Sequence, residues 1–409
     1  MIAGNSHPLR TQFLRAIRPN IHVIERHSDP DEFEFFTSEE FAAREEKIEF
    51  LIDDMLIANQ PAVIGGLAKD CKTGLAVDLA VSLSAGKPFL GKFRVRTPWR
   101  AGIISVENGF AALQHTAKHI CRSKGVSLAA ANVDWCTRFP RLDSDSRLSR
   151  LSNYIRSRAL KVLVLDPLYL ILGVRGEGIA PGDLFGMGEL LARASDACLS
   201  AGCTPVFVHH FNRSSSYRRR KPTDMGRRHW DPPDLFDLSQ AGAAEYFRQW
   251  LLVARRRPFD PDIGLHELWL NVGGSAGFSG LWAVDILEGR LTSSLNNRRW
   301  DVTIRTRAKL IEEEQREKFD QKASRQESQL NGDCYQVLKS LHAQPQGETK
   351  RGIREKTGLS DTRLNRATER LLSINWLEEI NVTKGGGNAR ERSYAGYRLT
   401  EKGRKADAL

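Results

Sequence analysis

The sequence predicts an α/β protein with a mainly parallel sheet covered by helices on both faces, followed by a smaller C-terminal domain. Two observations lead to this prediction. From residue 61 to about 290, short β-type runs alternate with helical stretches, and the first five runs are mainly apolar, as buried parallel strands are. Beyond residue 330 the pattern changes to short helices, a turn and two strands.

Eight short runs have the composition of strands. They are 62–65, 102–107, 133–139, 161–166, 204–209, 250–255, 267–272 and 281–286. The last three follow one another closely, which predicts antiparallel edge strands. Ahead of the runs, Ser38 and the acids after it predict a helix that starts there and continues to about residue 58. Residues 304–329 are charged and predict a linker helix.

These elements divide the 409 residues into four predicted parts. Residues 1–58 form an N-terminal lead-in, 59–295 the α/β core, 296–330 a helical linker and 331–409 the C-terminal domain.

Composition limits the class of protein. A run of 18 or more apolar residues is absent, and residues 1–18 contain no continuous apolar segment. We therefore expect no membrane span and no signal peptide. The six cysteines contain no Cys-x-x-Cys pair, which predicts reduced thiols in a cytoplasmic protein. The net charge of +11 favours an anionic partner.

The most informative motif follows the first apolar run. A glycine pair and a Lys-Thr pair precede a helix, and Gly66-x4-Cys71-Lys72-Thr73 is the P-loop pattern with Cys71 in place of its second glycine. Backbone N–H groups of such a loop hold phosphate. Lys72 would neutralise the phosphate oxygens, and Thr73 would bind Mg²⁺. The alternative is an ordinary glycine-rich turn with a chance Lys-Thr pair.

Two later runs end in acids. Asp166 closes the run 161–166, where its carboxylate could hold the hydration shell of Mg²⁺. Glu107 closes the run 102–107 and could activate the attacking water, or it could simply cap the next helix.

Two further runs end in basic or titratable residues. His210, after the run 204–209, could sense the γ-phosphate, although a structural histidine is equally compatible with the pattern. Arg255 is the first of three consecutive arginines and is a candidate arginine finger toward a neighbouring subunit. A solvated run of charges is the alternative for these arginines.

Five segments together carry a resemblance: 65–73, 78–91, 104–107, 163–168 and 208–211. They resemble the RecA-type AAA ATPases of the plasmid RepA helicase family, whose wider group includes DnaB and KaiC, over about residues 45–290. The resemblance implies a RecA-like core, the cofactors ATP and Mg²⁺, and often a hexameric ring. It places residues in the following roles: Gly65, Gly66, Lys69, Asp70, Cys71, Lys72, Thr73 and Gly74 at the nucleotide, Thr73 and Asp166 at Mg²⁺, Glu107 as base, and His210 as sensor.

Two basic regions are candidates for DNA binding. The segment 214–228 would track a single strand through Arg218, Arg219, Arg220 and Lys221. Residues 334–399 have the order of a winged helix-turn-helix, with Arg363 and Arg366 on its third helix and Lys384 and Arg390 on its wing. A disordered surface loop and a protein-interaction module are the respective alternatives.

The combined hypothesis is an ATP-dependent helicase or translocase of mobile-element DNA, acting as a homo-oligomer. A nucleotide-gated DNA-binding adaptor with slow or no hydrolysis is the second hypothesis, which Cys71 favours. A small-molecule phosphotransferase is the third, which the basic regions disfavour.

Overall fold

The computed structural model describes residues 33, 35–138, 141–171, 184–212, 220–221, 229–239, 242–290, 292, 297–384 and 392–406. The chain divides into two units, Met1–Glu49 and Phe50–Leu409. Within the first unit, α1 (Ser38–Ala43) begins after Thr37, whose hydroxyl accepts a hydrogen bond from the Glu40 N–H.

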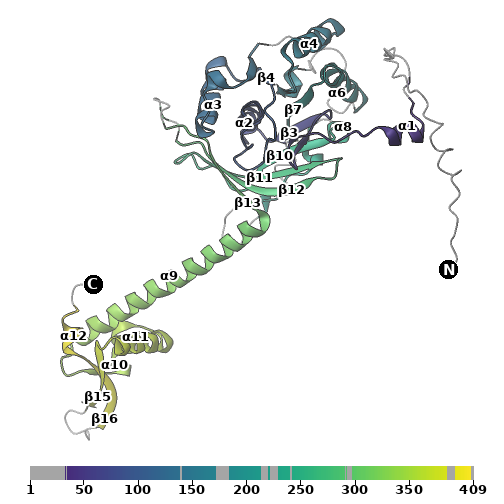
Figure 1. Cartoon of the computed structure of the whole chain (residues 1–409). Coiled ribbons are helices and arrows are strands. Elements are labelled where there is room, and N and C mark those ends of the chain that lie inside the picture. The colour runs from purple at the N-terminus through teal and green to yellow at the C-terminus, as the bar shows by residue number, and fades with distance from the viewer. Residues whose placement is uncertain are drawn as a thin grey trace, which may run out of the picture. The chain divides into compact units, whose positions relative to one another are not determined.

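The centre of the second unit is a nine-stranded sheet (Figure 1). Its order is β13-β12-β11-β10-β3-β7-β6-β4-β5. The strands are β3 (Ala62–Gly66), β4 (Ala101–Ser105), β5 (Val133–Cys136), β6 (Val162–Asp166), β7 (Thr204–His210), β10 (Gln249–Arg255), β11 (Leu265–Gly274), β12 (Ser279–Leu287) and β13 (Asp301–Thr306).

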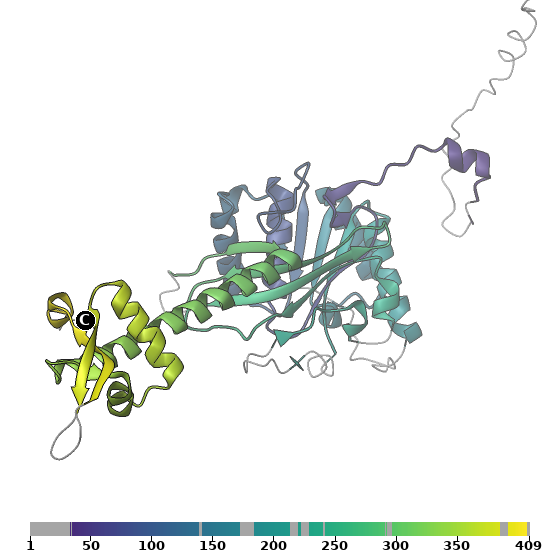
Figure 2. The ribbon, with the colours of Figure 1, turned by 90° about the horizontal axis from the view of Figure 1, so that it is seen from below.

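Helices cover both faces of the parallel part of this sheet, as predicted. Helices α2 (Lys72–Ala85) and α3 (Phe110–Ser123) pack on one face with Ile64, Val164 and Val208. Helices α4 (Asp145–Arg158), α6 (Leu184–Leu199) and α8 (Ala243–Tyr246) pack on the other face with Leu163 and Phe207. Figure 2 shows the sheet between these helices. Short helical segments α5 (Leu168–Ile171), Leu128–Ala130 and Leu235–Asp237 connect these elements.

The predicted direction of one strand is wrong. β10 pairs in parallel with β3, with Leu251 beside Ile64, and only its other edge meets an antiparallel strand, β11. The chain from β7 to β10 includes α8, so it crosses over to the far side of β3, which allows parallel pairing. β11, β12 and β13 are antiparallel, as expected for β11 and β12.

Two predicted boundaries also need correction. The predicted helix over 38–58 is limited to α1, and a hairpin of β1 (Phe50–Ile52) and β2 (Leu56–Ile57) follows. This hairpin is buried, and the Gln249 side chain bonds both the N–H and the C=O of Ile57. Residues 301–306, predicted within the linker, instead form the edge strand β13.

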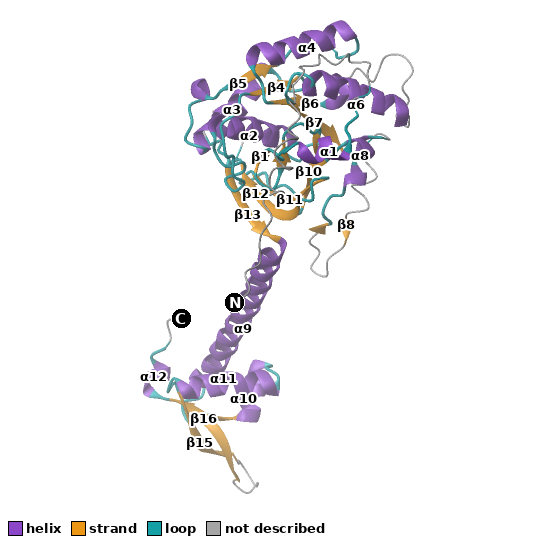
Figure 3. Ribbon diagram, turned by 45° about the vertical axis from the view of Figure 1, so that its right-hand side comes forward, coloured by secondary structure: helices purple, strands orange, loops and turns teal. Residues whose placement is uncertain are grey.

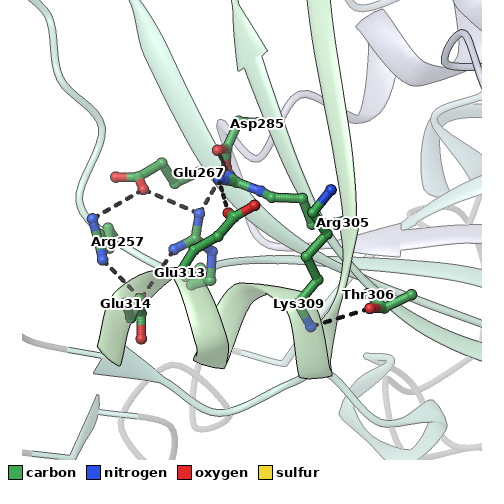
Figure 4. A network of polar contacts seen from close by, with 9 residues as sticks. Arg257, Glu267, Asp285, Arg305, Thr306, Lys309, Glu313 and Glu314 are labelled. Carbon is green, nitrogen blue, oxygen red and sulfur yellow. Dashed lines mark hydrogen bonds and ion pairs between the residues drawn. The ribbon is translucent and has the colours of Figure 1, made fainter. Parts of the chain in front are cut away.

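The linker helix is α9 (Arg307–His342), which starts directly after β13. A network of charges joins its first turns to the sheet (Figure 4). Arg256 is only 1% exposed and pairs with Glu267 and Asp285, while Arg257 bonds Glu314 of α9 at 2.8 Å. The interpretation of these arginines as a solvated run is therefore wrong for Arg256.

Figure 3 shows the helices and strands that follow α9 gathered at its end. These C-terminal elements have their own apolar core. The end of α9 packs with α10 (Lys350–Thr357) and α11 (Asp361–Ser373), and the core includes Val337, Leu341, Ile353, Leu364 and Leu371. β14 (Glu348–Thr349), β16 (Arg392–Leu399) and β15 (Leu377–Lys384) form a three-stranded sheet, and α12 (Glu401–Arg404) follows it. We call this group of elements the C-terminal module. The second and third predicted helices form as α10 and α11, whereas the first is the end of the longer α9.

Among the described residues, no helix combines the length and the apolar character needed to cross a membrane. A separate two-stranded ladder joins β8 (Arg220–Lys221) to β9 (His229–Trp230).

Candidate nucleotide-binding site

The predicted P-loop connects the end of β3 to the start of α2. Lys69 and Cys71 both have left-handed backbone conformations, with φ of 67° and 59°. A left-handed conformation is unfavourable for a residue with a Cβ, which explains why glycine is usual at the position of Cys71. The helix begins at Lys72, so its first N–H groups lie in the loop without intrahelical partners and are available to an anion.

Lys72 lies inside this loop. Its Nζ donates a hydrogen bond to the Leu67 carbonyl at 2.6 Å, and the residue is 7% exposed. Burial lowers the pKa of Lys72, while the charges of Asp70, Asp166 and Glu107 act in the opposite direction. The ammonium group is therefore desolvated, bonds the P-loop backbone, and is stabilised by the charges of Asp70, Asp166 and Glu107.

A cluster of oxygen atoms lies at the start of α2. The Thr73 hydroxyl donates to Asp166 Oδ2 at 2.8 Å, and the Ser105 hydroxyl donates to the same oxygen at 3.1 Å. The Asn108 amide donates to the Thr73 hydroxyl at 3.3 Å. Burial raises the pKa of Asp166, and these two hydroxyl donors oppose that rise. Hard oxygen donors of this kind suit Mg²⁺, so this donor set fits the predicted metal.

Ser105 and Asn108 were missed by the sequence analysis. A signal was present, because Ser105 is the last residue of β4 and lies in register with Asp166 on the neighbouring parallel strand. Parallel strands bring their carboxyl ends to one edge of the sheet, so a polar residue at the end of either strand is a candidate for the same site.

Glu107 lies two residues beyond the end of β4 and is exposed. Its negative charge raises the pKa of both Lys72 and Asp166, so it acts electrostatically on the oxygen cluster. The alternative of a helix cap has no structural support, because the residue before α3 is Gly109 and that helix has no side-chain cap. Glu107 therefore has the access to water that a base requires.

The two histidines at the end of β7 have different environments. His209 is buried, and its Nε2 lies 2.7 Å from the Ser239 carbonyl, which indicates a structural role. His210 lies opposite Gly66 in the strand register, with its ring 5.7 Å from that of Tyr169. Burial lowers the pKa of both histidines to about 4, so each is neutral at pH 7. His210 can therefore act as a hydrogen-bonding group rather than as a cation.

Arg255 contacts the P-loop of its own chain. Its Nε donates to Asp70 Oδ1 at 3.0 Å, and its Nη2 donates to the Lys69 carbonyl at 2.8 Å. Asp70 is 2% exposed, and its Oδ2 is buried with no hydrogen-bond partner among the described residues. Burial raises the pKa of Asp70 to about 6 despite the nearby positive charges.

Three glycines predicted at the nucleotide have close neighbours instead of open space. A Cβ at Gly65 would lie 2.7 Å from Leu238 and Leu252 side chains, and one at Gly66 would lie 2.9 Å from Val253. A Cβ at Gly74 would lie 2.6 Å from Trp300, whose indole N–H donates to Asp78. The surrounding core and Trp300 therefore already require glycine at these positions.

The residues predicted to contact DNA are only partly described. Arg218, Arg219 and Arg390 lie outside the described residues, and Arg220 and Lys221 form β8. In the C-terminal module, Arg363 pairs with Asp333 of α9, and Lys384 pairs with Glu348. Arg366 lines a pocket of about 310 Å³ together with Arg363, Arg370 and Asp333. Two of the predicted DNA contacts thus already have acidic partners.

Comparison with known families supports the interpretation of the first part of the chain. Residues 28–216 match the family described as AAA domain. A comparison with curated proteins finds no match. The match and the α/β fold support an AAA-type P-loop domain that binds nucleotide, usually with a divalent metal. The strands β10–β13, α9 and the C-terminal module lie beyond the matched residues.

Proposed function

We propose that this protein hydrolyses ATP with Mg²⁺ and uses the hydrolysis to act on DNA, as a RepA-like helicase or translocase of a mobile element. The single observation that supports hydrolysis best is the cluster of Thr73, Asp166 and Ser105 oxygens beside Lys72. It combines hydroxyl and carboxylate donors with one desolvated cation at the start of a 14-residue helix.

The residues of the cluster have distinct proposed roles. Lys72 leaves the Leu67 carbonyl and neutralises the terminal phosphate oxygens. Thr73 and Asp166 would hold Mg²⁺, which would neutralise charge that develops on the phosphate. Glu107 takes a proton from the attacking water, and neutral His210 donates or accepts a hydrogen bond near the γ-phosphate. Catalysis by such a site rests on positioning and charge stabilisation.

Arg255 is proposed to hold its own P-loop through Asp70 and the Lys69 carbonyl. As an arginine finger toward a neighbouring subunit it would first have to leave both partners. A ring of subunits, with a hexamer as the form typical of the resembled family, remains our expectation.

DNA binding is proposed for two surfaces. The net charge of +11 favours it, and so does the order of helices and strands in the C-terminal module, which resembles the order that we predicted for a winged helix. We propose that the segment 214–228 contacts a single strand and that the C-terminal module contacts a duplex. Arg366 on α11 and the wing between β15 and β16 would provide the duplex contacts.

Glu107→Gln tests the hydrolytic part of the proposal. This change removes the proton acceptor and keeps the side-chain shape, so it should retain ATP binding and lower turnover by about 10²–10⁴-fold. Lys72→Ala should lower both binding and turnover. Glu317→Gln, an exposed glutamate on α9, is the matched control and should change neither. ATP binding by calorimetry and phosphate release would be measured for all three variants. If Glu107→Gln hydrolyses ATP as fast as the parent protein, Glu107 is not the base. If Lys72→Ala binds ATP as tightly as the parent protein, the nucleotide site is assigned wrongly.

A second experiment separates a motor from an adaptor. Sizing the protein with and without ATP and Mg²⁺, followed by a strand-displacement assay, should give a ring that unwinds DNA. A stable monomer or dimer that binds DNA without unwinding it would instead support the nucleotide-gated adaptor. Cys71 is the observation that favours this second candidate, because its left-handed backbone conformation is one that glycine adopts much more readily than cysteine.

A further inference from the structure

We propose that Cys71, His266 and Glu288 form a zinc-binding site that fastens the P-loop to the antiparallel part of the sheet. The proposal goes beyond nucleotide hydrolysis, and it concerns the one residue of the P-loop that departs from the usual pattern.

Three separate segments bring the ligand atoms together. Cys71 precedes α2, His266 is the second residue of β11, and Glu288 follows β12 directly. The Cys71 Sγ, a ring nitrogen of His266 and a carboxylate oxygen of Glu288 all lie within 4.8 Å of one another. His266 Nε2 and Glu288 Oε2 are 3.6 Å apart. Ligands at zinc distances in a tetrahedral site are separated by roughly 3.3–3.8 Å, so small movements would complete the geometry.

The chemistry of the donors selects the metal. A thiolate, an imidazole and a carboxylate are all ligands that zinc accepts, and water would be the fourth. Magnesium and calcium prefer oxygen ligands only, which distinguishes this site from the Thr73–Asp166 cluster. The Cys71 thiol loses its proton to solvent when the sulfur–zinc bond forms, so binding of one zinc ion releases one proton.

The environment of His266 leaves its imidazole able to bind a metal ion. Its side chain is only 9% exposed, and its Nδ1 has no hydrogen-bond partner among the described residues. The distance from its Nε2 to Glu288 is longer than a hydrogen bond. The Phe259 ring lies 4.4 Å from the imidazole and limits its movement. Nε2 is therefore the ring nitrogen that faces Glu288 and could bind an ion beside that carboxylate.

The backbone around His266 and Glu288 is firmly positioned. The Glu288 N–H donates to the Gly264 carbonyl at 2.9 Å, and the Arg299 N–H donates to the Glu288 carbonyl at 2.9 Å. Gly264 has a φ of 72°, and a Cβ there would lie 2.2 Å from the Gly289 carbonyl oxygen. The side chain of Arg298 bonds Glu288 Oε2 at 2.6 Å. Oε2 is also the oxygen that lies 3.6 Å from His266 Nε2, so a small rotation of the carboxylate would let Arg298 keep one oxygen while the other binds a cation.

Zinc binding at this site would affect the loop that binds the nucleotide. Cys71 lies two residues before Thr73, and the backbone between them forms the start of α2. A zinc ion on Cys71 would hold this start against β11 and the end of β12, so that zinc release would free the loop to move. The cost of a non-glycine residue in the left-handed conformation would then be offset by the ligand that it provides.

Metal titration of the full chain tests the proposal without nucleotide, so its failure is distinguishable from failure of the ATPase proposal. After removal of metal with a chelator, Co²⁺ would be added as a spectroscopic probe and then displaced with Zn²⁺. We expect one ion per chain and an absorption band from cobalt–thiolate charge transfer. Cys71→Gly and His266→Gln should each weaken zinc affinity by on the order of 100-fold, since even loss of a ligand's hydrogen-bonding partner costs 10–100-fold.

Two variants separate a loss of zinc binding from misfolding and from an unrelated cysteine. Cys71→Gly restores the usual P-loop residue, so its backbone conformation remains favourable and a loss of metal does not reflect misfolding. Cys136→Ala removes a half-buried cysteine of β5 outside the site and should leave zinc affinity and the cobalt band unchanged. Binding that persists in Cys71→Gly, a cobalt spectrum without the thiolate band, or less than stoichiometric binding by the parent would each overturn the zinc site.

Discussion

Two ion pairs, one at the P-loop and one in the C-terminal module, join a nearly buried acid to a partly exposed arginine. In the first, the Asp70 side chain is 2% exposed and that of Arg255 is 21% exposed. In the second, the Asp333 side chain is 5% exposed and that of Arg363 is 45% exposed. The two pairs look alike in these numbers but differ in their hydrogen bonds.

Asp70 is incompletely satisfied, whereas Asp333 is satisfied at both oxygens. Arg255 bonds only one oxygen of Asp70 and gives its second bond to the Lys69 backbone. Arg363 bonds both oxygens of Asp333 through two different nitrogens. The pair at the P-loop therefore holds the loop in place but leaves the Asp70 carboxylate buried and incompletely paired, which is costly. The pair in the C-terminal module fixes α11 on α9 and neutralises the positive charge of Arg363.

The largest effect should follow from removing the arginine at the P-loop. Arg255→Met leaves Asp70 buried with no arginine partner, so the free energy of unfolding should fall by about 3–5 kcal/mol. Denaturant unfolding of the full chain would measure it. The double variant Arg255→Met/Asp70→Asn removes the buried charge as well and should recover most of the loss.

An exposed pair provides the control for this prediction. Arg299 and Asp301 have side chains 53% and 57% exposed, so Arg299→Met should change stability by less than about 1 kcal/mol. If the double variant is no more stable than Arg255→Met, the buried charge is not the cause of the loss.

A smaller effect should appear as pH dependence. The folded protein raises the pKa of Asp70 from 3.8 to about 6, so between these values the folded state holds a proton that the unfolded state has lost. The contribution of Asp70 to the free energy of unfolding is therefore at its maximum below about pH 4. It decreases by up to about 3 kcal/mol as pH rises through 6. Asp70→Asn should lack this loss when unfolding is measured from pH 4 to 7.

His209 offers a contrast of opposite sign. Its pKa is lowered by burial from 6.5 to about 4, so its contribution to stability is lost as pH falls through that range. Between about pH 4 and 6, His209→Gln should therefore make the free energy of unfolding fall more steeply as pH rises, whereas Asp70→Asn should make it fall less steeply. The same change of slope in both variants would contradict the assigned directions.

The smallest effect concerns the C-terminal module. Asp333→Asn releases Arg363 from its ion pair, so the affinity for duplex DNA should rise a few-fold, and the salt dependence should steepen by about one counterion. Fluorescence anisotropy at several salt concentrations would measure both. Glu401→Gln, which frees the exposed Lys405 instead, is the control. An unchanged salt dependence in Asp333→Asn would mean that this face of α11 does not meet DNA.

The sequence predicted most of the fold because its signals are local. Apolar runs identified the strands of the parallel sheet, and the Gly-rich loop with Lys72 and Thr73 identified the start of α2. β13 was missed because residues 301–306 contain polar and charged residues that suit an exposed edge strand as well as a helix. The hairpin of β1 and β2 was missed because its stability comes from burial and from Gln249, about 190 residues away.

The pattern of residues was enough to identify the polar side chains near the ends of the strands: Lys72, Thr73, Glu107, Asp166 and His210. How they pair followed from the folded chain, because pairing depends on which strand ends meet at one edge. The tertiary structure joined Ser105 to Asp166, Arg255 to Asp70, and Cys71 to His266 and Glu288. It also showed that Arg363 and Lys384 already have acidic partners. Contacts between residues distant in sequence arise from packing and strand order, and neither is encoded in the local pattern of any one segment.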